Sequence, residues 1–284
     1  MHMPIIEFTQ RDVLAQIPKR KLDSHKGDYG RILLLCGSRG YTGAPELAAK
    51  GALRTGAGLV YLCVPDSIYQ IVACKLTEPI VYPVPDNDGT YCSAAIKKIA
   101  ELLPRMDAVL VGPGIGKSEG SRNVVEFVLN NFEGPIVLDA DGINAIKTNI
   151  DILRSRKFPT VLTPHMGEFE NIGGDVHKNK AKAATELALD LNSIVVLKGR
   201  RTIITDGKAC FEINTGNPGM AVGGSGDVLA GIITSLIAQH MSPLTAAACG
   251  AWLNGAAGDA CAAEMGQYGM LPSDYVNYLP RLMY

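Results

Sequence analysis

The sequence lacks an excess of charge of either sign, and it lacks any long apolar run. Lysine and arginine together number 27 against 28 aspartate and glutamate residues, which gives a net charge of −1. Proteins that bind nucleic acid usually carry surplus positive charge for the phosphate backbone, so we expect no nucleic acid partner. The most apolar segments, residues 228–238 and 244–263, are interrupted by polar residues or glycine before they reach the ~18 residues of a membrane span. We therefore expect no membrane partner.

The seven cysteines form no recognisable pattern. Their number is odd, and no two lie close enough together for a zinc knuckle or a Cys-x-x-Cys motif, so we expect neither a disulfide framework nor a zinc site. Residues 1–10 also lack the basic start and apolar stretch of a secretory signal. We expect a cytoplasmic protein with reduced thiols.

Up to residue 197, short apolar runs rich in β-branched residues alternate with segments suited to helices. Such runs are typical of strands buried on both faces, and the alternation predicts βαβ units around a parallel sheet. We expect strands at residues 31–36, 59–64, 108–111, 136–138, 160–162 and 194–197, and helices at residues 44–55, 93–103, 119–131, 142–147 and 178–191.

The pattern changes after residue 197. Residues 202–205 and 210–213 flank Asp206-Gly207, a hairpin signal that predicts an antiparallel pair at the sheet edge. Closing helices rich in small residues, which allow close helix packing, are expected at residues 225–240, 243–264 and 273–282. We expect one α/β domain over residues 1–284, with a mostly parallel central sheet, helices on both faces and an antiparallel edge.

Two glycine-rich loops follow predicted strands, which is where an open parallel sheet places its ligand. The first runs from Gly37 to Gly43 and leads into a helix near Ala44. The second is Gly112-Pro113-Gly114-Ile115-Gly116. Each can be a turn that needs positive φ, but the number of missing side chains favours a close approach to a ligand.

The second loop only superficially looks like a phosphate-binding Walker loop. Val111 stands where the Walker pattern needs its first glycine, and Pro113 removes a backbone donor. No Gly-x-Gly-x-x-Gly motif follows the first strand either, so a dinucleotide-binding dehydrogenase is not expected.

Residues 214–227 are the most glycine-rich segment and run directly into an apolar helix. Exposed backbone amides and the positive end of the helix dipole favour an anion at such a place. Asp227 has two interpretations in this setting. It can cap the helix, or it can act as a base while Gly224, Ser225 and Gly226 hold a transferring phosphoryl group in an anion hole.

Polar residues follow three further predicted strands. They are Asp139-Ala140-Asp141, Thr163-Pro164-His165 and Lys198-Gly199-Arg200-Arg201-Thr202. A lone histidine is usually packed or solvated, but the carboxyl end of a strand gives His165 an equal claim to a ligand contact. The basic segment is either a solvated turn or a contact for nucleotide phosphate and ribose.

Together these motifs resemble the ADP/ATP-dependent NAD(P)H-hydrate dehydratases of the ribokinase-like superfamily. The resemblance runs from His25-Lys26-Gly27-Asp28-Tyr29-Gly30 to Gly223-Gly224-Ser225-Gly226-Asp227-Val228-Leu229, and the order of the motifs makes it specific. There are two departures. Ser225 stands where the family commonly has Thr, and the segment after Asp141 reads Gly142-Ile143 in place of Ala-Leu. Neither departure removes a charged or hydroxyl group.

The resemblance implies a ribokinase-like fold and a repair reaction. In that reaction ADP or ATP, with Mg²⁺, drives water out of the S epimer of hydrated NADH or NADPH. It further implies a homotetramer, and we expect ADP to be the preferred donor, as in stand-alone members. Many members are fused to an epimerase domain, which we do not expect within these 284 residues. By resemblance, the residues that contact the hydrated cofactor are Ala44, Gly114 or Gly116, His165 and Asp227, and those that contact the nucleotide are Lys198, Gly199, Arg200, Arg201, Thr202 and Gly226.

Two alternatives remain. A vitamin-precursor kinase of the same superfamily would use the same Gly-Ser-Gly-Asp segment on a hydroxymethyl or hydroxyethyl group, and it would release a phosphorylated product. A non-catalytic nucleotide sensor would have no use for Asp227 and its amides, so we disfavour it.

Overall fold

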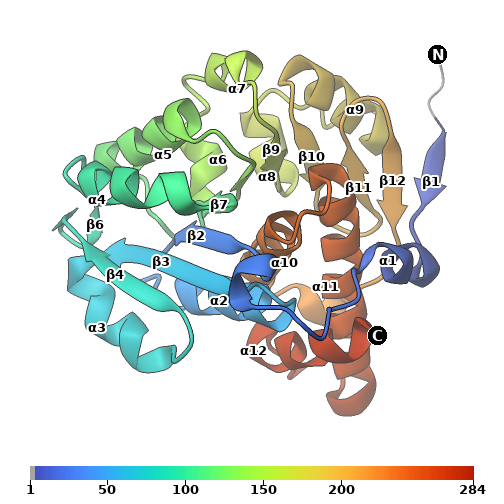
Figure 1. Cartoon of the computed structure of the whole chain (residues 1–284). Helices are drawn as coiled ribbons and strands as arrows, with labels where there is room; N and C mark the ends of the chain where they lie inside the picture. The colour runs from blue at the N-terminus through green and yellow to red at the C-terminus, as the bar shows by residue number, and fades with distance from the viewer. Residues whose placement is uncertain (1–3) are drawn as a thin grey trace.

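The computed structural model describes residues 4–284, and residues 1–3 of the segment expected to lack a secretory signal lie outside that range. Its centre is a 10-stranded sheet (Figure 1). The strand order is β1 (Ile5–Glu7), β12 (Cys210–Ile213), β11 (Thr202–Thr205), β10 (Ile194–Leu197), β9 (Thr160–Leu162), β8 (Ile136–Leu138), β7 (Ala108–Val111), β2 (Arg31–Leu35), β3 (Leu59–Pro65) and β4 (Ile80–Val84). The strands from β10 to β4 in this order are parallel, and β11 is antiparallel to both of its neighbours.

The strands predicted from the sequence are confirmed within one or two residues. The predicted antiparallel pair, β11 and β12, is also confirmed, but β1 pairs with β12 in parallel and forms the outer edge. All three residues of β1 are exposed, so this strand carries no pattern of burial. Strand β4 and the small ribbon of β5 (Asp86–Asn87) and β6 (Thr90–Tyr91) were likewise not predicted.

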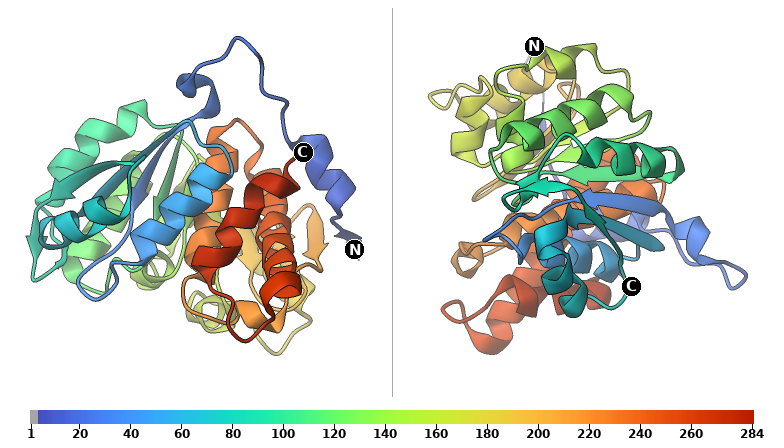
Figure 2. Two further views of the ribbon diagram at one scale, coloured as in Figure 1. Left: turned by 90° about the horizontal axis from the view of Figure 1, so that it is seen from below. Right: turned by 90° about the vertical axis from the view of Figure 1, so that its left-hand side faces the viewer.

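Helices cover both faces of the sheet, as predicted. Alternate residues of β2 enter two different hydrophobic clusters, with Ile32 and Leu34 in one and Leu33 and Leu35 in the other. Figure 2 shows the sheet between the two helix layers. The first layer holds α1 (Gln10–Gln16), α2 (Ala44–Arg54), α3 (Asp66–Lys75), α10 (Ser225–Ala238), α11 (Pro243–Met265) and α12 (Pro272–Tyr275), and the second holds α4 (Ala95–Leu102), α5 (Glu119–Asn131), α6 (Asp141–Ala145), α7 (Asp151–Ser155), α8 (Met166–Asn171) and α9 (Lys180–Asp190).

The last predicted helix differs from expectation. Only Pro272–Tyr275 is α-helical, and Val276–Leu282 continues as a 3₁₀ helix that contains Pro280. Proline has no backbone N–H and its ring crowds the preceding turn, which interrupts a regular α-helix.

Helices α2 and α10 meet with their main chains in contact. A β-carbon built on Gly51 would lie 2.5 Å from the carbonyl oxygen of Val228, and one on Gly231 would lie 2.0 Å from that of Ala48. The small residues predicted to allow close helix packing do so here, and they fix the start of α10 against α2.

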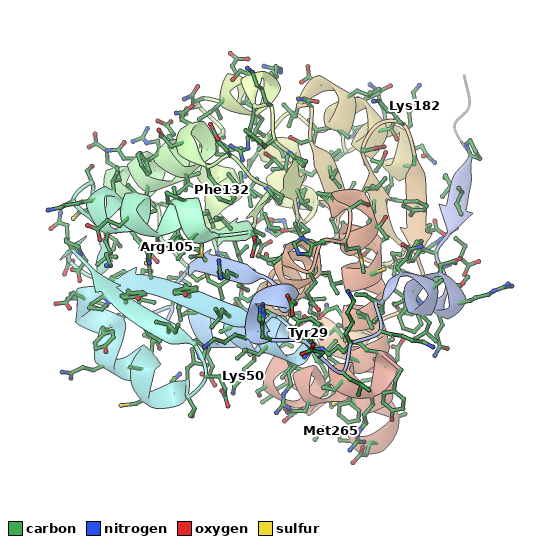
Figure 3. All side chains as sticks on the ribbon, viewed as in Figure 1. Tyr29, Lys50, Arg105, Phe132, Lys182 and Met265 are labelled. Atoms are coloured by element: carbon green, nitrogen blue, oxygen red, sulfur yellow. The ribbon has the colours of Figure 1, made fainter. Side chains whose placement is uncertain are left out.

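All seven cysteines are unpaired. Five of them are buried, whereas Cys74 on α3 is exposed and Cys92 is half-buried. Figure 3 shows charged side chains such as Lys182 at the outside of the molecule. Within residues 4–284, no helix combines the length and the apolar character that crossing a membrane requires.

Candidate active site

The two glycine loops meet where the strand order of the sheet reverses. Strands β2 and β7 are parallel neighbours, but the chain continues outward from them in opposite directions. The Gly37 N–H donates to the carbonyl of Pro113 at 2.8 Å, and the Ser38 hydroxyl donates to the carbonyl of Gly114 at 2.7 Å. A crevice at such a reversal is the usual ligand site of an open α/β sheet. The structure therefore joins both predicted loops into one wall.

Glycine is required within the second loop. Gly114 and Gly116 have φ angles of 64° and 79°, in the left-handed region that favours glycine. A β-carbon on Gly114 would lie 2.8 Å from the β-carbon of Tyr41 and 3.1 Å from that of Ala44. The Asp141 carboxylate accepts the N–H of Gly116 at 3.1 Å. Ala44 and Gly114, both expected at the hydrated cofactor, thus lie against each other.

Helix α10 begins with the predicted anion-binding turn. Gly224 is its N-cap residue and has a φ angle of 99°. The backbone N–H groups of Gly224, Gly226 and Asp227 donate to no atom of residues 4–284. The Ser225 N–H donates to the carbonyl of Val222 at 3.4 Å. Three of the four amides are therefore free for an anion.

Asp227 does not cap the helix. Within the described chain its carboxylate takes part in no hydrogen bond, and the cap position belongs to Gly224. Burial and, to a lesser extent, the negative charge of Asp139 raise the pKa of Asp227, and the positive charge of Lys198 opposes them; the net result is a pKa of about 7. A carboxylate whose pKa lies near the working pH is well suited to act as a general base.

An ion pair between a buried carboxylate and a half-buried lysine lies beside this turn. The Lys198 Nζ is 2.8 Å from Asp139 Oδ1 and 3.9 Å from Glu168 Oε2. The Thr163 hydroxyl donates to the same Asp139 oxygen at 2.6 Å. Burial lowers the pKa of Lys198, but the carboxylates of Asp139 and Glu168 outweigh it, so the net shift is upward and the ammonium stays charged.

The ion pair was not predicted from the sequence. Lys198 was expected only as part of a nucleotide-binding turn, and Asp139 only as a polar residue after a strand. A β-carbon on Gly226 would lie 3.3 Å from Lys198 Nζ and 3.6 Å from Asp139 Oδ2. The ammonium therefore lies next to the free amides of the turn.

His165 is the N-cap residue of α8. Its Nδ1 accepts the N–H groups of Gly167 at 3.0 Å and Glu168 at 3.2 Å, which assigns the proton of the neutral ring to Nε2. The side chain is 62% exposed. His165 thus stabilises the start of α8 and still presents its ring at the carboxyl edge of the sheet.

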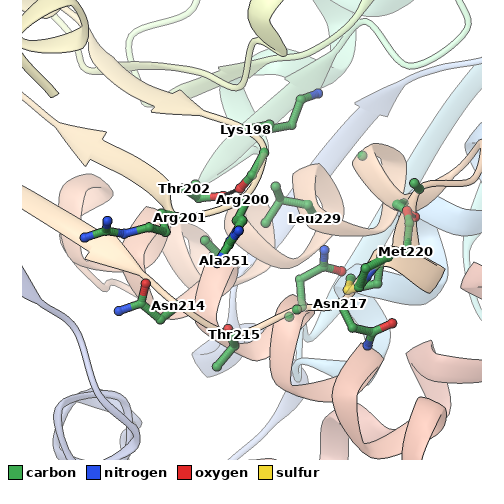
Figure 4. A pocket seen from close by; sticks show the side chains of 18 residues that line it. Lys198, Arg200, Arg201, Thr202, Asn214, Thr215, Asn217, Met220, Leu229 and Ala251 are labelled. Carbon is green, nitrogen blue, oxygen red and sulfur yellow. Dashed lines mark hydrogen bonds between the residues drawn. The ribbon is translucent and has the colours of Figure 1, made fainter. Parts of the chain in front are cut away.

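A cavity of about 740 Å³ adjoins the anion-binding turn (Figure 4). All of the residues expected at the nucleotide line it, and so does Ser225. Figure 4 shows the Lys198 side chain leading away from that of Arg201, which instead pairs with Glu212 at 2.8 Å. The lining residues are Lys198, Gly199, Arg200, Arg201, Thr202, Asn214, Thr215, Gly216, Asn217, Pro218, Met220, Ala221, Ser225, Gly226, Leu229, Ala251, Asn254 and Gly255.

The far wall of this cavity is anchored to α11. The Asp259 carboxylate accepts the N–H of Gly216 at 2.8 Å and the side-chain amide of Asn217 at 2.9 Å. The Thr215 hydroxyl donates to the carbonyl of Trp252 at 3.0 Å. Sequence reasoning did not single out Asp259, because nothing in its neighbourhood along the chain marks it as a partner of residues 214–217.

Comparison with known proteins finds relatives that match nearly the whole chain. A bifunctional NAD(P)H-hydrate repair enzyme, Nnr, of Moorella thermoacetica is 40% identical over 275 residues, which cover 95% of this chain and 52% of that protein. The chain thus spans about half the length of the curated relatives it matches.

Solved structures agree. The ADP/ATP-dependent NAD(P)H-hydrate dehydratase of Bacillus subtilis, co-crystallized with ATP/Mg²⁺, superimposes with a TM-score of 0.84 at 31% identity, covering 99% of this chain and 98% of that one. A ribokinase-like superfamily protein of Enterococcus faecalis superimposes with a TM-score of 0.87 at 26% identity, covering 98% and 95% of the two chains. The predicted ribokinase-like fold is confirmed. Because the sequence pattern of the NAD(P)H-hydrate dehydratases also matches residues 32–281, this chain belongs to that family.

Proposed function

We propose that this chain removes water from the S epimer of hydrated NADH or NADPH, with ADP or ATP as the phosphoryl donor. The observation that carries the proposal is the Asp227 carboxylate, which forms no hydrogen bond within the described chain and belongs to the same turn as the free amides. Ser225 and Gly226 in the same turn line the cavity, and Leu47 of α2 packs against Gly224. Base, anion site and ligand cavity are thus contiguous.

The chemistry needs little more than a kinase site. Hydroxide is a poor leaving group from a saturated ring carbon, whereas phosphate is a good one. The substrate hydroxyl oxygen attacks the terminal phosphorus as its proton passes to Asp227, and the bond from phosphorus to the rest of the nucleotide breaks. The lone pair of the ring nitrogen then expels phosphate. Loss of a proton from the neighbouring ring carbon restores the dihydropyridine.

The site residues divide between the two ligands. Ala44, Gly114, Gly116 and His165 would receive the hydrated cofactor, and Lys198 to Thr202 would receive the nucleotide together with Gly226. The amides of Gly224, Gly226 and Asp227 would hold the moving phosphoryl group, because the Ser225 N–H is already bonded. Supporting this division, the cavity is lined by Lys198–Thr202 and Gly226 but not by Ala44, Gly114, Gly116 or His165.

We propose that Mg²⁺ accompanies the nucleotide and screens its phosphate charge. No group of three or more His, Cys, Asp or Glu side chains that could hold a metal occurs within residues 4–284. What supports magnesium is the Bacillus subtilis dehydratase, which was co-crystallized with ATP/Mg²⁺. Magnesium at such sites usually keeps several waters and binds one or two carboxylates besides the phosphates. We also propose ADP as the preferred donor.

We further propose a cytoplasmic homotetramer. The small residues of α11 are buried within the chain. Met265, the last residue of α11, and Leu271, beyond the end of this helix, are 52% and 49% exposed and offer apolar surface for contact between copies. Light scattering of the purified protein tests the assembly.

The decisive experiment supplies hydrated NADH with Mg²⁺ and either ADP or ATP, and follows NADH absorbance and free phosphate. We expect both products in equal amounts, with ADP the better donor. A stable phosphorylated product would indicate a kinase instead, and nucleotide binding without turnover would indicate a sensor. If ATP proves better by a wide margin, only the donor assignment is wrong.

A further inference from the structure

We propose that Asp139 is a positioning residue for phosphoryl transfer, because it holds the Lys198 ammonium beside the free amides at the start of α10. The inference rests on the proposed function. Asp139 follows β8 and Lys198 follows β10, so the two residues meet across the end of β9.

Hydrogen bonds and burial hold the Asp139 carboxylate in one orientation. Its residue is 1% exposed, and its Oδ1 accepts both the Thr163 hydroxyl at 2.6 Å and the Lys198 ammonium at 2.8 Å. Thr163 is fully buried and also bonds the carbonyl of Leu138 at 3.2 Å. A carboxylate held in this way cannot rotate freely, so it determines where the ammonium lies.

Lys198 needs such a partner. A lysine side chain is long and flexible, and it occupies one place only when something holds it. The alternative partner, Glu168, lies 3.9 Å from the ammonium, which is too far for a hydrogen bond. Glu168 is itself engaged by the N–H of His165 at 2.9 Å. Loss of the Asp139 charge would leave the ammonium without a fixed position near Gly226.

The position of the Lys198 ammonium matters because the transferring phosphoryl group brings negative charge to this turn. During transfer the negative charge of the phosphoryl group is spread over its three equatorial oxygens. Cations and hydrogen-bond donors that already point toward those oxygens stabilise the transition state. A buried carboxylate near a phosphate site would ordinarily repel the phosphate. If Asp139 merely repelled, its neutralisation would speed the reaction. If it positions Lys198, neutralisation slows the reaction.

The test is a double-mutant cycle with Asp139→Asn and Lys198→Met, measured with hydrated NADH, ADP and Mg²⁺. Asparagine has nearly the same shape and keeps an oxygen for Thr163. We expect each single variant to lower kcat by roughly 10- to 100-fold, near or below the usual loss for one charge-stabilising donor. The KM for hydrated NADH should change less than about threefold, because the ammonium acts on the phosphoryl group. At a pH where Asp227 is ionised in every variant, Asp139→Asn should change kcat less than about twofold when Lys198 is already Met.

Two outcomes of this cycle would overturn the positioning role. One is an Asp139→Asn enzyme whose kcat is at least half of the wild-type value or exceeds it. The other is a double variant whose fold-loss of kcat equals the product of the fold-losses of the two single variants. Asp151→Asn, which removes a surface partner of Arg154, serves as the matched control and should leave kcat unchanged.

A second variant covers a failure of Asp139→Asn to fold. Lys198→Arg keeps the charge but moves it, and we expect at least a 10-fold loss of kcat, whereas wild-type kcat would overturn the role. A wild-type enzyme that converts no hydrated NADH overturns the proposed function, and the positioning role with it. If the wild-type enzyme is active and Asp139 variants have the same kcat as the wild type, only the positioning role is overturned.

Discussion

His165 and Glu168 cap the same helix reciprocally. The imidazole Nδ1 accepts the Glu168 N–H at 3.2 Å, and the Glu168 carboxylate accepts the His165 N–H at 2.9 Å. This capping box means that removal of the histidine ring disturbs α8 as well as any ligand. A test of His165 as a substrate contact therefore needs a replacement that still caps.

Asparagine is such a replacement, since it is among the best N-cap residues. We expect His165→Asn to raise the KM for hydrated NADH and to leave the KM for the nucleotide nearly unchanged. Loss of one neutral hydrogen bond costs about 0.5–1.5 kcal/mol, or roughly a 2- to 13-fold rise. His165→Ala should show the same rise together with a lower Tm. A larger effect on the nucleotide KM would remove His165 from the cofactor site.

Asp227→Asn tests the base. Asparagine cannot take the proton, and general bases typically contribute about 10²–10⁴-fold, so kcat should fall by at least two orders of magnitude. Because Asp227 does not cap α10, neither Asn nor Ala should lower the Tm through a lost cap. Steady-state kinetics of the purified variants measures kcat, and thermal unfolding measures Tm. Near wild-type kcat in Asp227→Asn would exclude the catalytic role.

The pH dependence follows from the surroundings of Asp227. Besides burial, the charge of Asp139 raises the pKa of Asp227 and that of Lys198 lowers it. The Asp227 charge in turn adds to the effect of burial in raising the pKa values of the Cys36 thiol and the Tyr275 phenol. With its pKa raised to about 7, the base is ionised only above that pH, so kcat/KM should rise with pH and level off above about 7. An acid limb near pH 4 would contradict this environment.

The same pKa affects folding stability with a definite sign. The native state holds the Asp227 proton more tightly than the unfolded chain, whose carboxyl has the ordinary value of 3.8. This contribution to stability is therefore present at low pH and is lost as the pH rises from about 4 to 7. Denaturant unfolding at several pH values should show that loss in the wild type and a weaker pH dependence in Asp227→Asn.

Gly231→Ala tests the contact between α2 and α10. The added methyl group would lie 2.0 Å from the carbonyl oxygen of Ala48, so the helices must separate. Overpacking of this kind typically costs about 1–3 kcal/mol of unfolding free energy, which urea denaturation measures. Gly269→Ala is the control, because no atom lies within 4 Å of its added carbon. Equal stability of the two variants would mean that the helices are not in main-chain contact.

Most of the sheet could be predicted because its central strands are short apolar runs buried on both faces. Strand β1 could not, since its three residues are all exposed and its pairing with β12 depends on tertiary contact. Helix α8 is short and follows a loop whose main feature in the sequence is a functional motif. Its start is set by His165, a residue that is not among the usual N-caps.

The site was predicted as separate motifs rather than as one arrangement. The glycine loops and Asp227 stand out because glycine and an acid before an apolar helix are visible locally. The pairing of Asp139 with Lys198 is not local, because it requires β8, β9 and β10 to be neighbours in that order. Both residues did carry one usable signal, since each directly follows a buried parallel strand.

The distribution of thiols gives the protein a ready means of chemical labelling. Burial raises the pKa of Cys36 well above its usual range and raises that of Cys63 and Cys249 to about 12, so these thiols stay protonated and slow to react. Cys74 is exposed and Cys92 is half-buried. A maleimide dye should therefore attach to the native protein first at Cys74, without any engineered cysteine. The buried thiols become available only as the chain unfolds, and their alkylation rate then reports on the opening of the core.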